Sequence, residues 1–251
     1  MLKVRVIPTL LHKDVGLVKG VGFASDRRVG AALQAVKVYN RRGVDELVFL
    51  DVTATREGRP PDFALIDELA DECFMPLTVG GGVRRVGDFE ELLAVGADKV
   101  AVNTAAIGRP ELIGEAAAAF GVQCVVASID VKAEADGWRV WARCGTQPTD
   151  LEPVAWARQC EDRGAGEILL TSIDRDGAMT GYDLAVTRQV AEAVSIPVIA
   201  SGGAGGFAHM AEAILEAGAS AVAAASIFHF TEMTPREAKE HLRSKGVPVR
   251  L

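Results

Sequence analysis

The second half of the chain repeats the first half at a nearly constant offset. Residues 43–51 (GVDELVFLD) correspond to residues 164–172 (GAGEILLTS), with Glu46 matching Glu167 at 167 − 46 = 121. Residues 75–82 match residues 196–203 at 196 − 75 = 121, and residues 96–104 match residues 218–226 at 218 − 96 = 122. Such self-similarity indicates one supersecondary arrangement used twice. No linker rich in proline, glycine or serine separates the halves, so we expect a single domain over residues 1–251.

Short apolar runs alternate with amphipathic stretches along the chain. The candidate strands are residues 4–8, 46–51, 77–79, 99–102, 124–130, 167–172, 198–201 and 221–225. Repeated strand–helix units predict a parallel sheet. Eight of them in 251 residues predict one α/β domain, a (β/α)8 TIM barrel made of two similar (βα)4 halves. An open doubly wound sheet is the alternative, but it would not require the repeat.

Composition excludes several classes of protein. The net charge of −7 argues against a non-specific nucleic-acid binder. No apolar run reaches the length of about 18 residues that a membrane span needs, and no signal peptide is expected. The four cysteines are scattered without metal-ligand spacing, which indicates reduced thiols in a cytoplasmic protein. We expect no metal and no cofactor.

Two glycine-rich turns, one in each half, follow predicted strands. Glycine lets the backbone approach a ligand closely and leaves N–H groups free for an anion. In α/β barrels, phosphate commonly lies on two consecutive loops of this kind. Glycines that merely ease tight turns are the alternative, but the matching second copy favours two phosphate sites. The predicted binding residues here are Gly81, Gly82, Asn103, Thr104, Gly202, Gly203, Ala225 and Ser226.

Aspartates stand at or just after the ends of three predicted strands: Asp51, Asp130 and Asp176. Asp130 ends an apolar run, so we expect its carboxylate in the barrel mouth, where partial burial would raise its pKa toward that of a general acid or base. A helix cap or surface turn is the alternative, above all for Asp174. Lys19 is predicted to be a flexible cation that reaches a phosphate, with a solvated loop lysine as the alternative.

Charged residues open four of the predicted strands. Arg5, Glu46, Lys99 and Glu167 should lie together at the floor of the barrel, the end opposite the mouth. Buried charges are costly unless they are paired, so we expect a closed ring of ion pairs. Residue chemistry alone favours a structural plug over a functional role for this ring.

Taken together, these residues resemble the HisF family, the cyclase subunits of imidazole glycerol phosphate synthase. The resemblance spans essentially the whole chain. It is carried by the segments RVIP at 5–8, VKG at 18–20, DELVFLD at 45–51, VGGG at 79–82, GAGEILLT at 164–171, DRDG at 174–177, SIPVIASGGA at 195–204 and SIFHF at 226–230.

The resemblance implies a HisH-like glutaminase docked on the barrel floor, with Asp98 helping to hold it. Ammonia would pass the charged ring, which would then be an ammonia gate, and travel through the barrel to a phosphorylated substrate at the mouth. There Asp130 and Asp176 would be catalytic, and Lys19, Asp51, Thr171 and Gly177 would join the phosphate-binding residues in holding the substrate.

One departure from the family affects the chemistry directly. In the family, the first strand carries an aspartate that acts with the strand-five aspartate as an acid/base pair, whereas Leu11 stands at that position here. Leucine cannot transfer a proton, and His12 and Asp14 need not reach the same point. The loop after strand five also departs from the family, because residues 143–147 read RCGTQ where a glycine pair is common.

The pattern around Leu11, with residues 72–76 (ECFMP), resembles the WbuZ-type paralogue of HisF, which is associated with glycosyl amidation in surface-polysaccharide biosynthesis. Our first hypothesis is therefore an ammonia-accepting barrel that serves sugar amidination together with a glutaminase and a sugar amidotransferase. The second is a working cyclase of histidine biosynthesis, which converts PRFAR and ammonia to imidazole glycerol phosphate and AICAR. The third is a catalytically silent scaffold that only activates its glutaminase.

Overall fold

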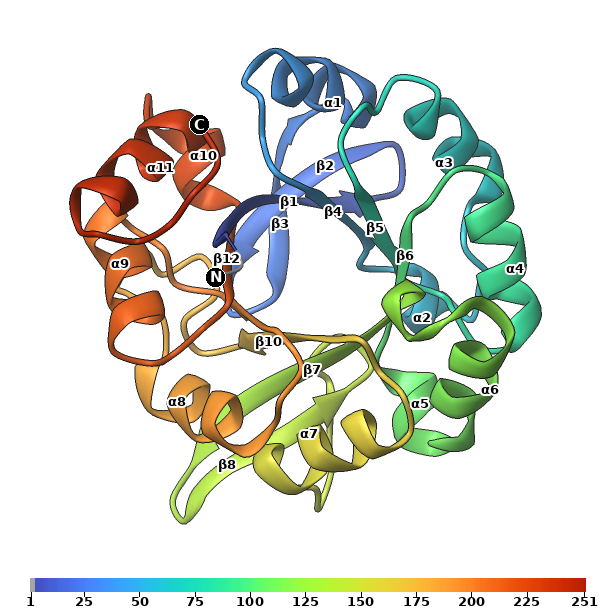
Figure 1. Ribbon diagram of the computed structural model, residues 1–251. Helices are drawn as coiled ribbons and strands as arrows, with labels where there is room; N and C mark the ends of the chain where they lie inside the picture. The colour runs from blue at the N-terminus through green and yellow to red at the C-terminus, as the bar shows by residue number, and fades with distance from the viewer. Residues whose placement is uncertain (1–2) are drawn as a thin grey trace.

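The computed structural model describes residues 3–251, apart from the side chains of Ser25 and Asp26. Parallel strands form a closed ring with helices packed around it (Figure 1). The barrel strands are β1 (Arg5–Lys13), β4 (Leu47–Asp51), β5 (Leu77–Gly80), β6 (Lys99–Val102), β7 (Val125–Glu134), β10 (Glu167–Ser172), β11 (Val198–Ser201) and β12 (Ala221–Ala224). Strand β10 pairs with β7, and β12 pairs with β1, which closes the barrel. The predicted TIM barrel is confirmed.

Each barrel strand is followed by a helix of the outer layer. These helices are α1 (Ala32–Arg41), α3 (Phe63–Ala70), α4 (Val86–Ala94), α6 (Glu111–Phe120), α7 (Pro153–Asp162), α8 (Leu184–Ala193), α9 (Phe207–Leu215) and α11 (Pro235–Ser244). Shorter helices are α2 (Ala54–Glu57), α5 (Thr104–Gly108), α10 (Ser226–Phe230) and the 3-10 turn η1 (Val122–Cys124). Among the described residues, none of these helices combines the length and hydrophobicity that a bilayer crossing requires.

Alternation of side chains along each strand divides the core into two parts. On β1, Val6 and Leu10 point outward and join the large cluster between strands and helices, whereas Ile7 points inward and joins a small cluster inside the barrel. Both clusters are apolar because parallel strands of a barrel are covered on both faces. Inward positions therefore recur at every second residue, and they decide what lines the barrel axis.

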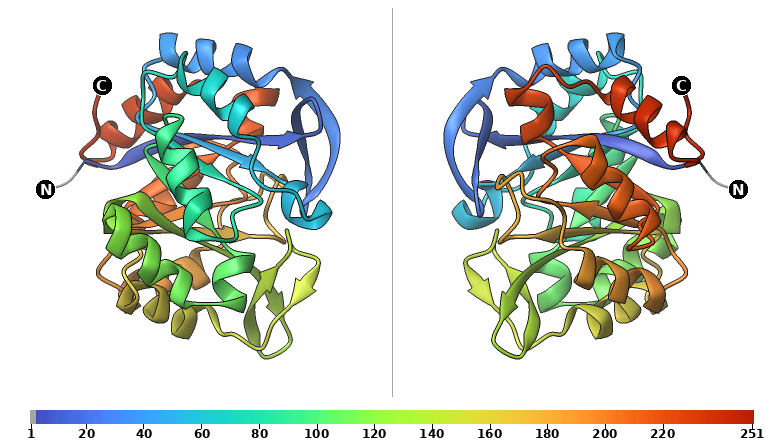
Figure 2. Two further views of the ribbon diagram at one scale, coloured as in Figure 1. Left: turned by 90° about the vertical axis from the view of Figure 1, so that its right-hand side faces the viewer. Right: turned by 90° about the vertical axis from the view of Figure 1, so that its left-hand side faces the viewer.

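Two antiparallel hairpins extend the sheet beyond the barrel at one end. Strand β1 runs on into β2 (Gly16–Val21) and β3 (Ala24–Gly30), and β7 runs on into β8 (Gly137–Ala142) and β9 (Gln147–Pro148). Figure 2 shows these hairpins at one end of the barrel and both termini at the other. Both β1 and β7 extend beyond their predicted ends at residues 8 and 130, because each continues into an antiparallel hairpin. The hairpins stand around the mouth.

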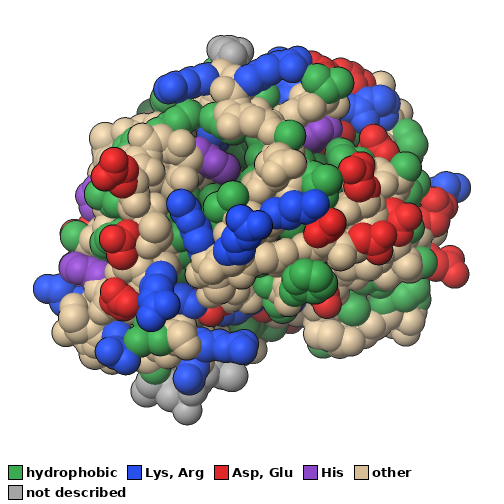
Figure 3. All heavy atoms as spheres, turned by 90° about the horizontal axis from the view of Figure 1, so that it is seen from above, with side chains coloured by type: hydrophobic (Ala, Val, Ile, Leu, Met, Phe, Trp, Pro, Cys, Tyr) green, Lys and Arg blue, Asp and Glu red, His purple; other side chains and the backbone are tan. Residues whose placement is uncertain are grey.

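The side of the barrel that carries α1 is seen in Figure 3. Charged side chains are scattered over it between small hydrophobic patches, and acidic side chains gather on the right, the side on which α3 lies. This mixture suits a solvent-facing surface. The two ends of the barrel, by contrast, carry the groups that bear on function.

Candidate active site and charged floor

A pocket opens at the carboxyl ends of the barrel strands, the end at which α/β barrels place their active sites. It is lined by all the catalytic and binding residues predicted for the mouth: Lys19, Asp51, Gly81, Gly82, Asn103, Thr104, Asp130, Thr171, Asp176, Gly177, Gly202, Gly203, Ala225 and Ser226. The topology therefore brings all fourteen of these predicted residues into one cavity.

The two glycine turns have matching geometry. Gly81 and Gly202 have φ of 106° and 85°, in the region that favours glycine. A Cβ on Gly81 would collide with the carbonyl oxygen of Asp51, and one on Gly202 would lie 2.6 Å from that of Ser172, the equivalent residue in the other half because 51 + 121 = 172. Each turn thus presents bare backbone to the pocket because the neighbouring strand leaves no room for a side chain.

The partners predicted for these turns are equivalent as well. Asn103 and Ala225 directly follow β6 and β12 and precede α5 and α10, with φ, ψ of −121°, −83° and −126°, −63°. Thr104 and Ser226 then begin the two helices, and both line the pocket. The mouth therefore contains two similar sites half a barrel apart, which we call cradles. Each consists of a glycine turn and the start of the short helix after the next strand: Gly81, Gly82 and Thr104 in one, and Gly202, Gly203 and Ser226 in the other.

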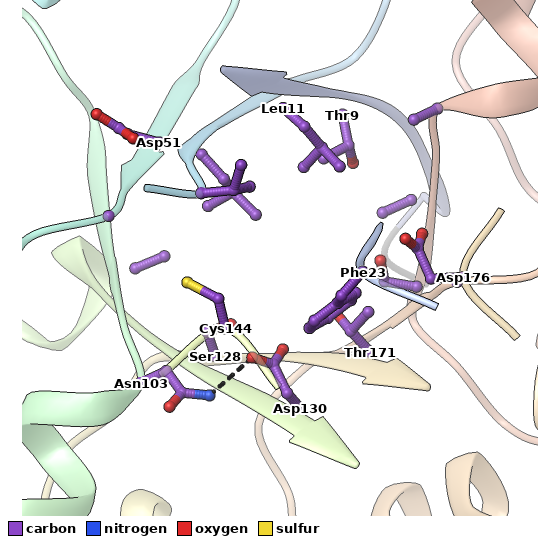
Figure 4. Close-up of a pocket in the computed structure, with 18 of the residues that line it drawn as sticks. Thr9, Leu11, Phe23, Asp51, Asn103, Ser128, Asp130, Cys144, Thr171 and Asp176 are labelled. Atoms are coloured by element: carbon purple, nitrogen blue, oxygen red, sulfur yellow. Dashed lines mark hydrogen bonds between the residues drawn. The ribbon is translucent and has the colours of Figure 1, made fainter. Parts of the chain in front are cut away.

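Asp130 lies deep in the mouth. Its side chain accepts a 3.0 Å hydrogen bond from Asn103 Nδ2, drawn as a dashed line in Figure 4. The pKa of Asp130 is raised to about 7, mainly by burial and to a smaller extent by the negative charge of Asp176. A carboxyl group with this pKa is present in both protonation states near neutral pH, as a general acid or base requires.

Asp176 is held by Lys19, whose Nζ lies 3.5 Å from Asp176 Oδ1. Lys19 lines the mouth, but neither the predicted flexible side chain nor the alternative of a solvated loop lysine is right, because strand β2 buries Lys19 to 2% exposure. The backbone ties the same two segments together, since Gly22 N donates to Asp176 O at 2.9 Å. Lys19 is thus a fixed cation at the edge of the pocket.

Asp51 is not a free base. Burial opposes its ionisation, but hydrogen bonds from the backbone N–H groups of Thr53 and Ala54 hold the pKa of Asp51 below its usual value. Arg59 approaches the other carboxylate oxygen at 3.3 Å. Asp51 therefore anchors the turn into α2 beside the first glycine cradle.

Leu11 stands in the mouth, at the position where the resemblance to HisF leads us to expect an aspartate. It lines the pocket and pairs in register with Leu50 of β4. His12 points to the other face of β1, where its ring packs against Phe49 with centroids 5.4 Å apart. Asp14 lies in the turn after β1 with φ of 57° and is exposed. Neither His12 nor Asp14 is among the described residues that line the pocket, so neither takes the place of the expected carboxylate.

At the opposite end, the four charged residues form the closed ring that was predicted. Arg5 contacts Glu46 at 2.5 Å and Glu167 at 3.0 Å. Lys99 contacts the same two carboxylates, each at 3.0 Å. Thr78 adds a hydrogen bond to Glu46 at 2.8 Å. Each charge thus has two partners of opposite sign, which offsets the cost of burial.

Asp98 lies beside this ring on the floor. It is exposed, and one of its carboxylate oxygens accepts a 2.8 Å hydrogen bond from Leu77 N. Its position is compatible with a contact to a partner, which stays a prediction.

Apolar side chains fill the barrel between the charged floor and the mouth. The cluster consists of Ile7, Val48, Ala101, Val126, Leu169, Ile199, Ala221 and Ala223, each at most 3% exposed. A small neutral molecule could pass through such a layer at far lower cost than an ion. Floor and mouth are therefore separated by an apolar layer that disfavours ions.

Sequence reasoning missed some pocket residues. Phe23, Ser128, Cys144 and Ser201 also line the mouth. Ser128 and Ser201 could have been found, since each stands two residues beyond an inward apolar residue of its strand. Phe23 and Cys144 could not, because they come from the two hairpins, whose return over the mouth has no signal in the strand pattern.

Comparisons with known proteins agree with this architecture. The model of the family described as "Histidine biosynthesis protein" matches residues 5–234. The imidazole glycerol phosphate synthase subunits HisF of two Caulobacter vibrioides strains, NA1000 / CB15N and ATCC 19089 / CIP 103742 / CB 15, are each 53% identical to this chain. The alignment covers 100% of the chain and 97% of each relative. The chain belongs to the HisF family. Neither relative bears the name of the glycosyl-amidation paralogue, so that finer resemblance stays a prediction.

Proposed function

We propose that this HisF-family chain is the cyclase subunit of an imidazole glycerol phosphate synthase. It would convert PRFAR and ammonia to imidazole glycerol phosphate and AICAR in histidine biosynthesis. The observation that carries this proposal is the pair of equivalent glycine cradles at the mouth, because a substrate with two phosphate groups needs two such sites. A barrel that only conducted ammonia would need neither. The full-length similarity to HisF subunits supports the same conclusion.

The floor supports a supply of ammonia from a partner. A glutaminase of the HisH kind would dock on the end that carries the ring of Arg5, Glu46, Lys99 and Glu167, with Asp98 at the contact. Ammonia released there would cross the ring and then the apolar layer above it. Because that layer disfavours ions, it would admit neutral ammonia and hold back ammonium.

The mouth supports proton transfer by Asp130. Ring closure and lyase chemistry need a group that removes a proton at one atom and returns one at another. Asp130 suits both steps, because its pKa is about 7 and its carboxyl is fixed by Asn103. Asp176 is the neighbouring carboxylate, and Lys19 restrains it. Without an aspartate at Leu11, we expect the rate to fall short of that of a two-carboxylate site by the ~10²–10⁴-fold that a positioned acid or base contributes.

The experiment is ammonia-dependent turnover of PRFAR by the purified barrel, followed by the appearance of AICAR. Turnover that depends on both PRFAR and ammonia, and that disappears in Asp130→Asn, would support the proposal. Absence of turnover in a folded protein would refute it.

One observation favours a second candidate function. Leu11 removes one of the two carboxylates that the family uses, which fits a barrel whose task is to deliver ammonia to a sugar amidotransferase. This candidate predicts no PRFAR turnover but full stimulation of a copurified glutaminase. The charged ring and the apolar layer support both candidates equally, whereas the two cradles favour the first.

A further inference from the structure

Inward-facing residues form successive layers along the barrel axis. On β1 they are Arg5, Ile7 and Thr9, then Leu11, at every second position. The same two-residue spacing of inward positions occurs on β7, where Val126 lies in the apolar layer and Ser128 in the mouth. The first mouth layer above the apolar cluster is rich in hydroxyl and amide groups: Thr9, Asn103, Ser128, Thr171 and Ser201.

Thr9 differs from the rest of this layer. Its residue exposure is 7%, and its hydroxyl has no hydrogen-bond partner among the described residues. In Figure 4 the hydroxyl points from β1 into the mouth. A buried hydroxyl without a partner is costly, and native proteins keep few such groups without a purpose. Its oxygen is therefore aimed, unpaired, at the place where the apolar layer ends.

We propose that Thr9 receives ammonia as it leaves the apolar layer and holds it below the bound substrate. The proposal rests on the function proposed above. Ammonia has three N–H donors and one lone pair, and the lone pair must stay free to attack. The Thr9 oxygen, acting as an acceptor for one N–H group, would leave that lone pair directed away from β1 toward the substrate. Leu11, the next inward residue on β1, would cover this position on the side of the mouth.

The test uses two variants of Thr9. Thr9→Val removes the hydroxyl and keeps the shape, and Thr9→Ser keeps the hydroxyl. With ammonium salts as the nitrogen source, we expect Thr9→Val to raise the KM for ammonia roughly threefold to tenfold, the loss of one hydrogen bond. The KM for PRFAR should stay constant, since an interaction with ammonia alone is removed. Thr9→Ser should behave like the parent protein.

Thermal unfolding gives a second readout that needs no activity. Removal of an unpaired buried hydroxyl should raise the Tm of Thr9→Val by about 2–4 °C in a chain of this size. Thr187 on α8 is the matched control, because its buried hydroxyl donates a 2.7 Å hydrogen bond to Asp183 O. Thr187→Val should lower the Tm and leave both KM values unchanged.

The outcomes separate this inference from the proposed function. PRFAR turnover by the parent protein with an unchanged KM for ammonia in Thr9→Val would overturn the role of Thr9 alone. An equal rise in both KM values, or a lower Tm in Thr9→Val, would overturn it as well, because the hydroxyl would then be structural. Absence of turnover by the parent protein would refute the proposed function and, with it, the role proposed for Thr9.

Discussion

Leu11 and Asp130 face each other across the mouth of the barrel (Figure 4). Leu11 lies on β1 and Asp130 on β7, four strands apart in the closed sheet, so the two stand on opposite walls. At the position of Leu11 the wall at β1 is apolar, since Leu11 pairs in register with Leu50. The wall at β7 carries Asp130, whose raised pKa suits the proton transfer that we propose for it. This asymmetry determines what we expect of the reaction.

Leu11→Asp should restore a second carboxylate at the place that faces Asp130. We expect kcat/KM for ammonia-dependent PRFAR turnover to rise by about 10²-fold, the lower end of what a positioned acid or base contributes. Leu11→Asn is the control, because it has nearly the same shape and cannot ionise. An equal gain in both variants would show that polarity or space, rather than proton transfer, limits the parent protein.

Asp130→Asn should reduce turnover by about 10²–10⁴-fold. In the parent protein, the pH dependence of kcat/KM should show an ionisation near pH 7, because burial and Asp176 raise the pKa of Asp130 to about 7. A profile that is flat from pH 6 to about 8, or one that Asp130→Asn does not alter, would contradict this assignment.

The same variant should change stability with a defined sign. The pKa of Asp130 is raised from 3.8 to about 7, so the folded state binds more protons than the unfolded chain between these values. Stability of the parent protein therefore falls as pH rises through this window, and the cost is complete above it. We expect Asp130→Asn to exceed the parent in stability above pH 7 by on the order of 1–4 kcal/mol, with the difference vanishing below about pH 4. Urea unfolding at several pH values measures it.

Glu46→Gln should open the charged ring. Arg5 and Lys99 would then share Glu167 alone, and breaking a buried ion pair in this way costs about 3–5 kcal/mol. We also expect glutamine-dependent turnover in complex with the glutaminase to fall more than turnover with free ammonia. Glu240→Gln is the control, because its ion pair with Arg236 is exposed and contributes little. Equal losses of glutamine-dependent turnover and of turnover with free ammonia would argue against a role of the charged ring as an ammonia gate.

Gly203→Ala should weaken binding at one phosphate cradle. Its φ is 111°, and a Cβ would collide with the carbonyl oxygen of Gly181. Strain of this kind costs about 1–3 kcal/mol, so we expect the KM for PRFAR to rise roughly tenfold. Gly206→Ala is the matched control three residues on, where a Cβ meets nothing within 4 Å. An unchanged KM in Gly203→Ala would remove this turn from the substrate site.

Much of the fold and of the site could be predicted because both follow from strand periodicity. The repeat at an offset of 121 predicted the closed barrel, and charges at four strand starts predicted the ring at the floor. These features depend on residues that a strand places at fixed intervals. Sequence therefore locates them well.

The rest could not be predicted because it depends on how loops return over the mouth. Lys19 was expected on a loop, but it lies in a hairpin that buries it against Asp176. Asp51 was expected among the substrate-binding groups; it lines the pocket, and its carboxylate also accepts hydrogen bonds from the turn into α2. The partner of Lys19 lies 157 residues away and is not fixed by spacing along the chain, whereas Thr53 and Ala54 follow Asp51 directly in a local turn.

The most direct test of the central claim is nitrogen transfer in the complete complex. The barrel and its glutaminase would be given PRFAR and glutamine with an isotopically labelled amide nitrogen, in the presence of excess unlabelled ammonium. Passage through the barrel predicts imidazole glycerol phosphate that carries mainly the label, and loss of that preference in Glu46→Gln. Product labelled only to the level of the bulk ammonium, or no product, would contradict the account.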